Sequence, residues 1–307
     1  MRADGLHTAR RAPTRPLLCS MLAHRPYDGS SKPFTIGIRP LEPARWIEPD
    51  GGLESYLAQK QDLFANKHAD VFAAQDDTRD SQCEIRDALA DYLTRHHPHL
   101  YRRDGGRIRI AAGERSVAFD DETPPLLQAA RLVQDDLAIM RRDEDGWRLA
   151  AAAICFPSTW VLREKFGRTL AEIHEPVPGF AGDMERRVAR IFDNLRIGAP
   201  VERFNWSIYD NDRLHHPRPS TRPSAAAFIR VERQTLLKMP RSHDILFTIR
   251  VLIDPLAAFR THPDGASLAQ SLREQLLAMT EAQLAYKGMT DSRNRLATKL
   301  AGLAATS

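Results

Sequence analysis

The sequence predicts an α+β fold in which helices come first along the chain and a mixed or antiparallel sheet follows. Two strand candidates, residues 137–140 and 147–156, are separated by an Arg-Arg-Asp-Glu-Asp-Gly turn that is typical of a hairpin. Three further strand-like stretches follow at residues 202–209, 228–238 and 245–253. Before them, apolar residues recur mainly at helical spacing. We therefore expect one compact domain with a helical N-terminal elaboration.

The first part of the chain contains three predicted helices. Apolar residues in 51–67 fall on one helical face, and a second helix runs into His96. A third, residues 124–134, begins with proline, which the first helical turn accepts. Short strands are predicted at residues 34–39 and at residues 107–110, where basic and apolar residues alternate.

Helices are also predicted between and after the later strands. Ser158 is a plausible N-cap for a helix over 159–170, and a further helix begins near Asp183. Residues 266–287 carry an apolar stripe and predict one long helix that is stopped by glycine. Residues 291–307 are expected to form a flexible tail.

Two other stretches bear on the organisation of the chain. Residues 1–26 are expected to form a disordered basic extension, which leaves residues 27–290 as the single domain; a transit peptide is the alternative for this arginine-rich start. The small side chains of residues 150–153 leave room above a strand, either for a closely packed helix or for a flat cofactor.

Charge and cysteine content restrict the class of protein. The net charge of +4 equals the excess in residues 1–25, five arginines against one aspartate, so the other 39 basic and 39 acidic residues balance. A body without net charge has no general attraction to a phosphate backbone, so nucleic acid is not an expected partner. No apolar run is long enough to span a membrane. Three cysteines without paired spacing fit a reducing, cytoplasmic setting.

The sequence contains none of the common catalytic motifs that would identify an enzyme class. The sequence has no glycine-rich phosphate loop, no Gly-x-Ser-x-Gly and no His-Glu-x-x-His. The pairs His96-His97 and His215-His216 lie in charged or loop-like surroundings, where solvated side chains are expected more often than metal ligands.

His174 is the strongest single candidate for a ligand. It ends a predicted helix, and Pro176 and Pro178 fix the direction in which the chain leaves. An imidazole held this way suits an axial haem or metal ligand, although a helix-terminal histidine often only caps backbone carbonyls. Cys155 is a rival, because a thiolate can also bind haem, but its place in a strand favours an inert core thiol.

Two strand candidates carry polar side chains where a central strand should be apolar. In residues 230–234, Arg230 and Glu232 share one face and Arg233 lies on the other, so buried ion pairs or an anion or substrate site are expected. In residues 203–207, Arg203 and Asn205 share one face of the strand. Trp206 lies on the other face and either packs in the core or lines a pocket for a small cation.

Several ordered blocks together resemble one family, the haem-dependent oxidative N-demethylase α-subunit family. The likeness extends from about residue 27 to about residue 285 and begins at Ile36-Gly-x-Arg-Pro-Leu41 with the downstream Trp46. The other blocks are Phe156-Pro-Ser-x-Trp160, Glu164-Lys-x-Gly167, Ile173-His-x-Pro-Val-Pro178, Arg203-x-Asn-Trp206, Arg230-x-Glu-Arg-Gln-Thr-Leu236 and Pro240-x-Ser.

The resemblance implies a Per-ARNT-Sim-like fold that binds haem b. It implies oxidation of a small secondary alkylamine such as dimethylamine, with O2, to a primary amine and formaldehyde. Electrons would come from NADPH through a partner reductase that carries FMN and a 2Fe–2S cluster, and a folate-binding subunit would take up the formaldehyde. The alternative is a haem-based gas or redox sensor with the same fold and no turnover; a third possibility is a haem-free small-molecule binding protein.

Within this resemblance the candidate residues take provisional roles. His174 becomes the preferred axial ligand of the haem iron. Glu232 or Asn205 would orient the substrate ammonium, with Trp206 stacked on it. The remaining candidates, Arg203, Arg230 and Arg233, would contact the haem propionates or the bound oxygen.

Overall fold

A seven-stranded antiparallel sheet forms the centre of the molecule in the computed structural model, which describes residues 22–218 and 227–305. Its strands lie in the order β1-β8-β9-β10-β6-β7-β2. They comprise β1 (Arg39–Pro40), β8 (Val201–Tyr209), β9 (Phe228–Lys238), β10 (Ile245–Pro255), β6 (Asp136–Asp143), β7 (Gly146–Ala153) and β2 (Phe72–Ala74). The α+β prediction is confirmed, and every pairing in this sheet is antiparallel rather than mixed.

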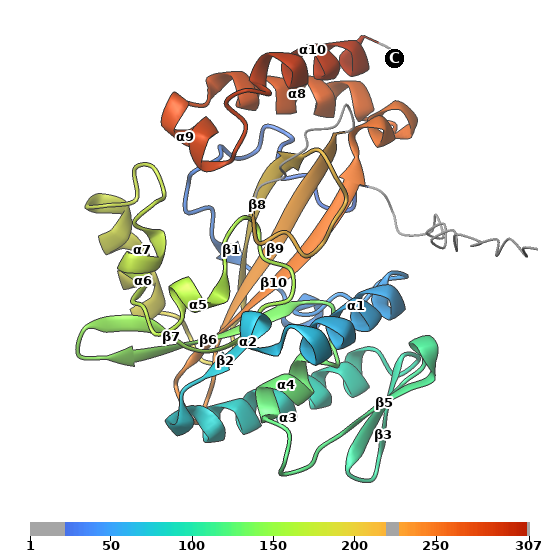
Figure 1. The fold of residues 1–307 in the computed structure, drawn as a ribbon, viewed down its shortest axis with the longest axis vertical. Coiled ribbons are helices and arrows are strands. Elements are labelled where there is room, and N and C mark those ends of the chain that lie inside the picture. Colours follow the sequence, from blue (N-terminus) through green and yellow to red (C-terminus); the bar gives the residue numbers. More distant parts are fainter. Residues whose placement is uncertain (1–21, 219–226, 306–307) are drawn as a thin grey trace, which may run out of the picture.

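Three groups of helices surround this sheet (Figure 1). The first group, with a small second sheet, lies at the lower end and comprises α1 (Leu53–Asn66), α2 (His68–Val71), α3 (Arg79–His96), α4 (Pro125–Ala130) and strands β3 (Tyr101–Asp104), β4 (Arg107–Ile110) and β5 (Arg115–Ala118). The C-terminal group lies at the opposite end and comprises α8 (Gly265–Ala278), α9 (Glu281–Tyr286) and α10 (Arg293–Ala304).

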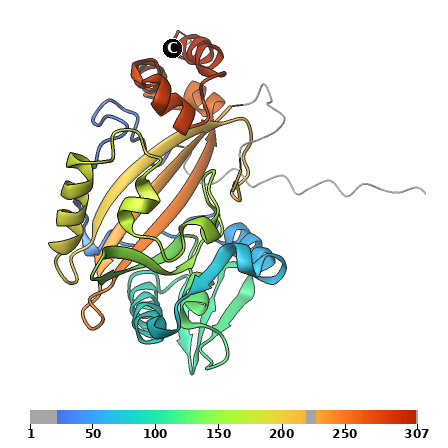
Figure 2. The ribbon, with the colours of Figure 1, turned by 60° about the vertical axis from the view of Figure 1, so that its left-hand side comes forward.

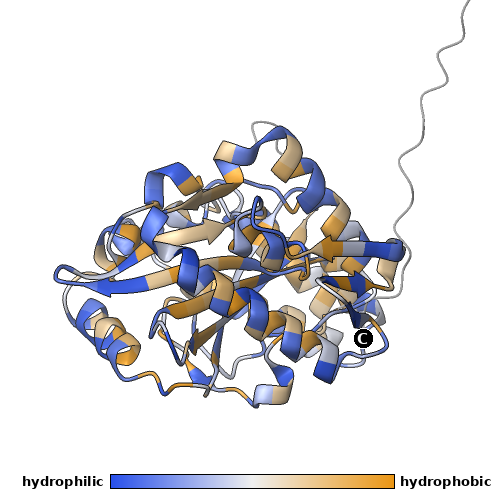
Figure 3. Cartoon of the chain, turned by 90° about the horizontal axis from the view of Figure 1, so that it is seen from below, coloured by the Kyte–Doolittle hydropathy of each residue, from blue (hydrophilic) through white to orange (hydrophobic). Residues whose placement is uncertain are grey.

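The third group is the clasp, residues 156–193, which contains α5 (Leu162–Lys165), α6 (Leu170–His174) and α7 (Asp183–Asp193). It covers one side of the long strands β8–β10 (Figure 2). Hydrophobic residues gather on the strands and on the inward sides of the helices (Figure 3). The burial of this apolar surface is the main favourable contribution to the fold.

Arg293–Ala304 form helix α10, so the prediction of a flexible tail from residue 291 is wrong for the described part of that stretch. Leu296, Leu300 and Leu303 of α10 are buried and belong to the same apolar cluster as α8. The helix was not predicted because its leucines repeat at helical spacing over only one short segment at the end of the chain. Of the predicted basic extension, residues 1–21 lie outside the described part, whereas Leu22 is buried.

The helix predicted over residues 159–170 is replaced by two short helices. Thr159 has φ of +59° and Gly167 has φ of +75°, conformations that interrupt a right-handed helix. Ser158 is not an N-cap, because its Oγ bonds the hydroxyl of Tyr209 at 2.8 Å. Residues 167 and 168 instead bond the backbone of Leu149 in β7, which anchors the start of α6 on the sheet.

The long helix predicted over residues 266–287 also divides in two. Met279 is extended, and Thr280 begins α9 with a capping box in which its Oγ1 accepts from the N–H of Gln283. The new direction carries Tyr286 and Lys287 towards the sheet, where both line a cavity.

One strand prediction needs correction, and for residues 150–153 the structure bears out the packed-helix alternative. Of residues 34–39, only Arg39 belongs to a strand, since Phe34 and Gly37 have positive φ. The alanines at 150–153 do not make room for a cofactor: they are fully buried, helices α4, α6 and α7 pack on β7, and none of the four alanines lines the cavity. The strands predicted at residues 107–110 and 228–238 are confirmed with the predicted bounds.

Candidate functional site

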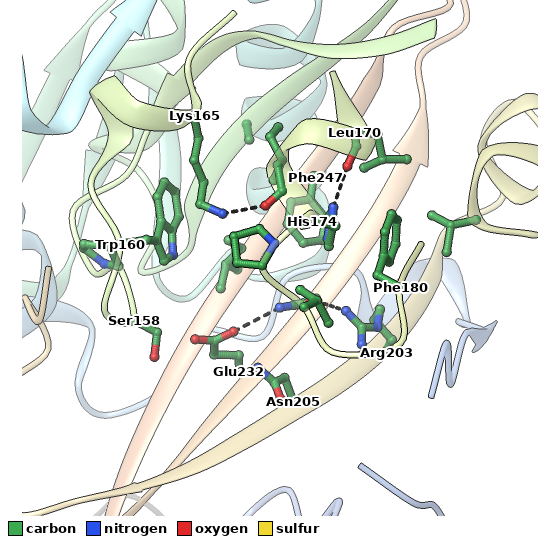
Figure 4. Close-up of a pocket in the computed structure, with 18 of the residues that line it drawn as sticks. Ser158, Trp160, Lys165, Leu170, His174, Phe180, Arg203, Asn205, Glu232 and Phe247 are labelled. Atoms are coloured by element: carbon green, nitrogen blue, oxygen red, sulfur yellow. Dashed lines mark hydrogen bonds between the residues drawn. The ribbon is translucent and has the colours of Figure 1, made fainter. Parts of the chain in front are cut away.

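A cavity of about 530 Å³ lies between the sheet and the clasp, and it falls in the size range of cofactor and small-molecule sites (Figure 4). One part is apolar and the other polar. The apolar lining comes from both walls: Ala138, Met140, Leu149, Leu170, Phe180, Val188, Phe192, Leu236 and Phe247. Such walls suit a flat, apolar ligand.

His174 lines this cavity from the last residue of α6. Thr169 caps α6 through a capping box with Glu172, so a helix of only five residues has a defined start. Its end is held by Lys165, whose Nζ donates to the carbonyl oxygen of Ile173 at 2.8 Å. The position of His174 is therefore fixed from both ends of the helix.

The ring of His174 is held in one tautomer. Its Nδ1 lies 2.8 Å from the carbonyl oxygen of Leu170, and because a carbonyl only accepts, Nδ1 carries the proton. The ring stacks on Phe180 with centroids 4.7 Å apart. Burial lowers the pKa of His174 to about 4, so the imidazole is neutral at physiological pH. The lone pair of Nε2 is thus available to a ligand, and no hydrogen bond engages it within the described residues.

The opposite wall is the polar face of β8 and β9. Arg203, Asn205 and Ser207 alternate along β8, and the register pairs Asn205 with Glu232 and Arg203 with Gln234. All five side chains line the cavity. A chain of hydrogen bonds runs across the strands, from Arg203 Nη1 to Gln234 Oε1 at 2.8 Å and from Gln234 Nε2 to Glu232 Oε2 at 3.0 Å (Figure 4).

Lys287 completes the polar end and was not predicted. Its ammonium group donates to Asn205 Oδ1 at 3.0 Å and to the carbonyl oxygen of Trp206, and burial lowers its pKa to about 8. Its neighbour Tyr286 also lines the cavity. The capping signature Thr280-x-x-Gln283 could have shown that the chain turns before Lys287.

Three predicted residues do not line the cavity. Trp206 faces the C-terminal helices, where its Nε1 donates to Gln275 Oε1 at 3.2 Å, so it cannot stack on a ligand here. Arg233 is buried on the far side of the sheet in an ion pair with Glu202 at 2.9 Å. Arg230 lies on the same face of β9 as Glu232, but its Nη2 donates to the carbonyl oxygen of Phe156 at 2.6 Å.

Cys155 is not placed to bind a ligand. It is fully buried in the core cluster that faces α1 and α4, and it is absent from the residues that line the cavity. Burial raises the pKa of its thiol well above the usual range, so the thiolate that binds metals does not form. The expectation of an inert core thiol fits this position.

The described residues contain no cluster of three or more His, Cys, Asp or Glu side chains that could hold a metal ion. In residues 22–218 and 227–305, no helix is long and apolar enough to cross a membrane.

A comparison with known families decides the membership of this chain. The model of the family described as "Haem-dependent oxidative N-demethylase, alpha subunit-like" matches residues 37–297, which is most of the chain. The chain belongs to this family. The matched region includes the sheet, the clasp and every residue that lines the cavity except Phe34, Thr35 and Ile36.

The cavity fits the haem that this family name implies. A neutral histidine with Nδ1 bonded to a backbone carbonyl is the usual arrangement of an imidazole ligand, because that bond fixes the ring and leaves Nε2 for the metal. Apolar side chains on both walls and cations at the polar end match the apolar macrocycle and its carboxylates. The residues present therefore suit a haem with one axial histidine.

Proposed function

We propose that this chain is the haem subunit of an oxidative N-demethylase that acts on a small secondary alkylamine of the dimethylamine type. One amine and one O2, with two electrons and two protons, would give a primary amine, formaldehyde and water. A methyl C–H bond is replaced by C–O, and the C–N bond then breaks. The electrons come from a separate reductase subunit.

The observation that supports this proposal most is the state of His174. It is neutral, its Nδ1–H donates to the carbonyl oxygen of Leu170, and its Nε2 is left for iron at the wall of an apolar cavity. Bound haem would supply the activation of O2 for attack on the methyl group. The protein's part is to hold the haem, shield it and position the amine.

Glu232 is the carboxylate placed to receive the amine. It lines the polar end of the cavity, and Gln234 orients it through a 3.0 Å hydrogen bond. Asn205, the cross-strand neighbour of Glu232, presents its amide to the same space. An ammonium group there would gain a charge-assisted hydrogen bond that holds the amine in the cavity.

The family name implies a haem and a multi-subunit system, and the remaining parts follow the resemblance found in the sequence. We place haem b in this chain, and FMN, a 2Fe–2S cluster and NADPH on a partner reductase, with a folate-binding subunit as an acceptor of formaldehyde. The antiparallel sheet with a clasp over one face is in keeping with a Per-ARNT-Sim-like haem domain. We expect this assembly to work in the cytoplasm.

The test is turnover with a chemical electron donor. The purified full-length chain, loaded with haem and reduced, should consume oxygen and release formaldehyde in equal amounts when dimethylamine is added. Glu232→Gln keeps the shape of the side chain without its charge, and it should raise the amine KM about tenfold or more. Stable oxygen binding that dimethylamine does not change would support the sensor alternative instead, and a protein that takes up no haem would exclude both.

A further inference from the structure

The polar end of the cavity carries more positive than negative charge. Arg203 of β8, Glu232 of β9 and Lys287 after α9 line it, and Arg230 of β9 lies outside the lining, 3.9 Å from Glu232. Lys287 and Arg230 are almost completely buried, with 6% and 1% of their surface exposed. Buried charges are costly unless they are paired, so the excess calls for an anionic partner.

Glu232 does not neutralise Arg203 or Lys287 by direct contact. Its Oε1 lies 3.9 Å from Nε of Arg230, and its Oε2 accepts from Gln234. Within residues 22–218 and 227–305, neither Arg203 nor Lys287 has a carboxylate oxygen within 4.0 Å. The one negative group is therefore already shared with Arg230.

Arg203 has only neutral partners. Its Nε donates to the carbonyl of Ile36 at 3.0 Å, its Nη1 to Gln234 at 2.8 Å, and its Nη2 to the carbonyl of Thr35 at 3.4 Å. A guanidinium has five N–H donors, so two remain, one on each terminal nitrogen. That pair of donors is the arrangement that binds a carboxylate with two hydrogen bonds.

Lys287 has neutral partners as well. Its three donors meet Asn205 Oδ1, the Trp206 carbonyl and, at 3.5 Å, Ser207 Oγ, and its charge lies 5.1 Å from the ring of Phe34. Because Arg203 and Asn205 are two residues apart on β8, they lie about 7 Å from each other. A carboxylate placed between Arg203 and Lys287 could accept from the two remaining donors of Arg203 and, in place of the 3.5 Å contact to Ser207 Oγ, from Lys287 Nζ.

The other charged groups of the lining do not change this balance. Asp136 accepts the N–H groups of Cys155 and Phe156 and lies 3.8 Å from the buried Lys60. Glu164 and Lys165 are neighbours in α5 of the clasp, where their opposite charges offset each other.

We propose that Arg203 and Lys287 form a carboxylate-binding subsite at the polar end of the cavity. Two ligands could bring this carboxylate: a propionate of the haem, or a substrate that carries its own carboxylate, such as an N-methyl amino acid. In the second case Glu232 would hold the methylated ammonium while Arg203 and Lys287 hold the carboxylate. This second source rests on the proposed function and narrows its substrate class.

The first arm tests the propionate. Haem and haem dimethyl ester are titrated into the full-length protein, and binding is followed by absorbance. If a propionate occupies the subsite, wild type binds haem at least tenfold more tightly than the ester. Arg203→Gln and Lys287→Met then lose that preference, whereas Arg187→Gln on the exposed side of α7 keeps it.

The second arm tests the substrate. N-methylglycine, acetate and dimethylamine are titrated into the haem-loaded protein, and the shift of the haem absorbance band is measured. If a substrate carboxylate occupies the subsite, N-methylglycine binds at least tenfold more tightly than dimethylamine. The advantage disappears in Arg203→Gln and Lys287→Met and persists in Arg187→Gln.

The outcomes separate this subsite from the proposed function. Should haem fail to bind, calorimetry with N-methylglycine and acetate on the haem-free chain still tests the subsite. Arg203→Lys retains a cation and guards against a folding defect, which circular dichroism would show. Equal affinity for haem and its ester, together with no preference for carboxylates over dimethylamine, would overturn the subsite even if dimethylamine were demethylated.

Discussion

The imidazole Nδ1 of His174 donates to the carbonyl oxygen of Leu170, one turn earlier in the same helix, at 2.8 Å. The sequence left two alternatives for this residue, a histidine that caps a helix and a histidine that binds a ligand. This contact shows that the two roles are compatible. The capping bond uses Nδ1 and thereby prepares Nε2 for a metal. The two roles belong to different nitrogens of one ring.

Replacement of His174 should remove the axial ligand of a bound haem. His174→Ala is expected to weaken haem binding tenfold or more and to change the absorbance spectrum, because no other histidine and no cysteine lines the cavity among the described residues. Added imidazole should restore the spectrum. Cys155→Ala is the matched control and should keep the wild-type spectrum, since its thiol faces the other core. A lost spectrum in Cys155→Ala alone would move the ligand role to the cysteine.

His174 should also contribute to the pH dependence of stability in the haem-free protein. Its pKa falls from 6.5 to about 4 on folding because burial disfavours the charged ring. The neutral form is favoured in the folded state, so the contribution is complete above pH 6.5 and is lost as the pH falls towards 4. The expected loss is on the order of 1 to 2 kcal/mol, since the ring is partly accessible from the cavity.

The measurement is the free energy of unfolding in urea between pH 7 and pH 4, compared for wild type and His174→Gln. The variant lacks the titrating ring, so its stability should fall less steeply over this interval. Parallel curves for the two proteins would show that His174 titrates normally.

Much of the sheet could be predicted from the sequence, whereas the lining of the cavity could be predicted only in part. Residues 228–238 form a strand with the predicted bounds because β-branched and long apolar residues alternate there with polar ones. Alternation along β9 and β8 also allowed us to predict that Glu232 and Asn205 face a ligand. It could not show that Trp206 and Arg233 are covered by other elements, since that depends on the helices packed on the far side.

The missing part of the site comes from chain breaks that periodicity does not reveal. Lys287 enters the cavity because the predicted long helix ends at Ala278 and restarts at Glu281. His174 occupies its position because positive φ at Thr159 and Gly167 divides the clasp into short helices. Both breaks are set by local capping and by contact with the sheet, and only the first has a signature in the sequence.

The buried ion pair of Arg233 and Glu202 should contribute to stability and not to ligand binding. The pair is 2.9 Å apart, and the two side chains are 1% and 5% exposed. Arg233→Met would leave the Glu202 carboxylate with only the partly exposed Arg39, at a cost of about 3 kcal/mol or more. Urea unfolding measures this cost, and Arg233→Met/Glu202→Leu should recover part of it. If Arg233→Met lost haem affinity without losing stability, Arg233 would instead have a role in the binding site.

Removal of α10 should destabilise the whole protein. A chain that ends at residue 291 lacks Leu296, Leu300 and Leu303, which are 2%, 0% and 4% exposed in the full-length protein. Each buried leucine contributes roughly 2 kcal/mol, so the loss is several kcal/mol and the apolar side of α8 becomes exposed. Thermal unfolding should show a markedly lower midpoint for the truncated chain.

The matched control for this truncation keeps the helix and changes its exposed side. Asn294→Ala/Thr298→Ala alters two exposed positions of α10 and leaves its leucines in place, so its midpoint should stay within a few degrees of wild type. Because α9 ends at Tyr286, directly before Lys287, and α10 follows α9, the truncation should also weaken the polar end of the cavity. An unchanged unfolding midpoint in the truncated chain would support the flexible tail that the sequence predicts.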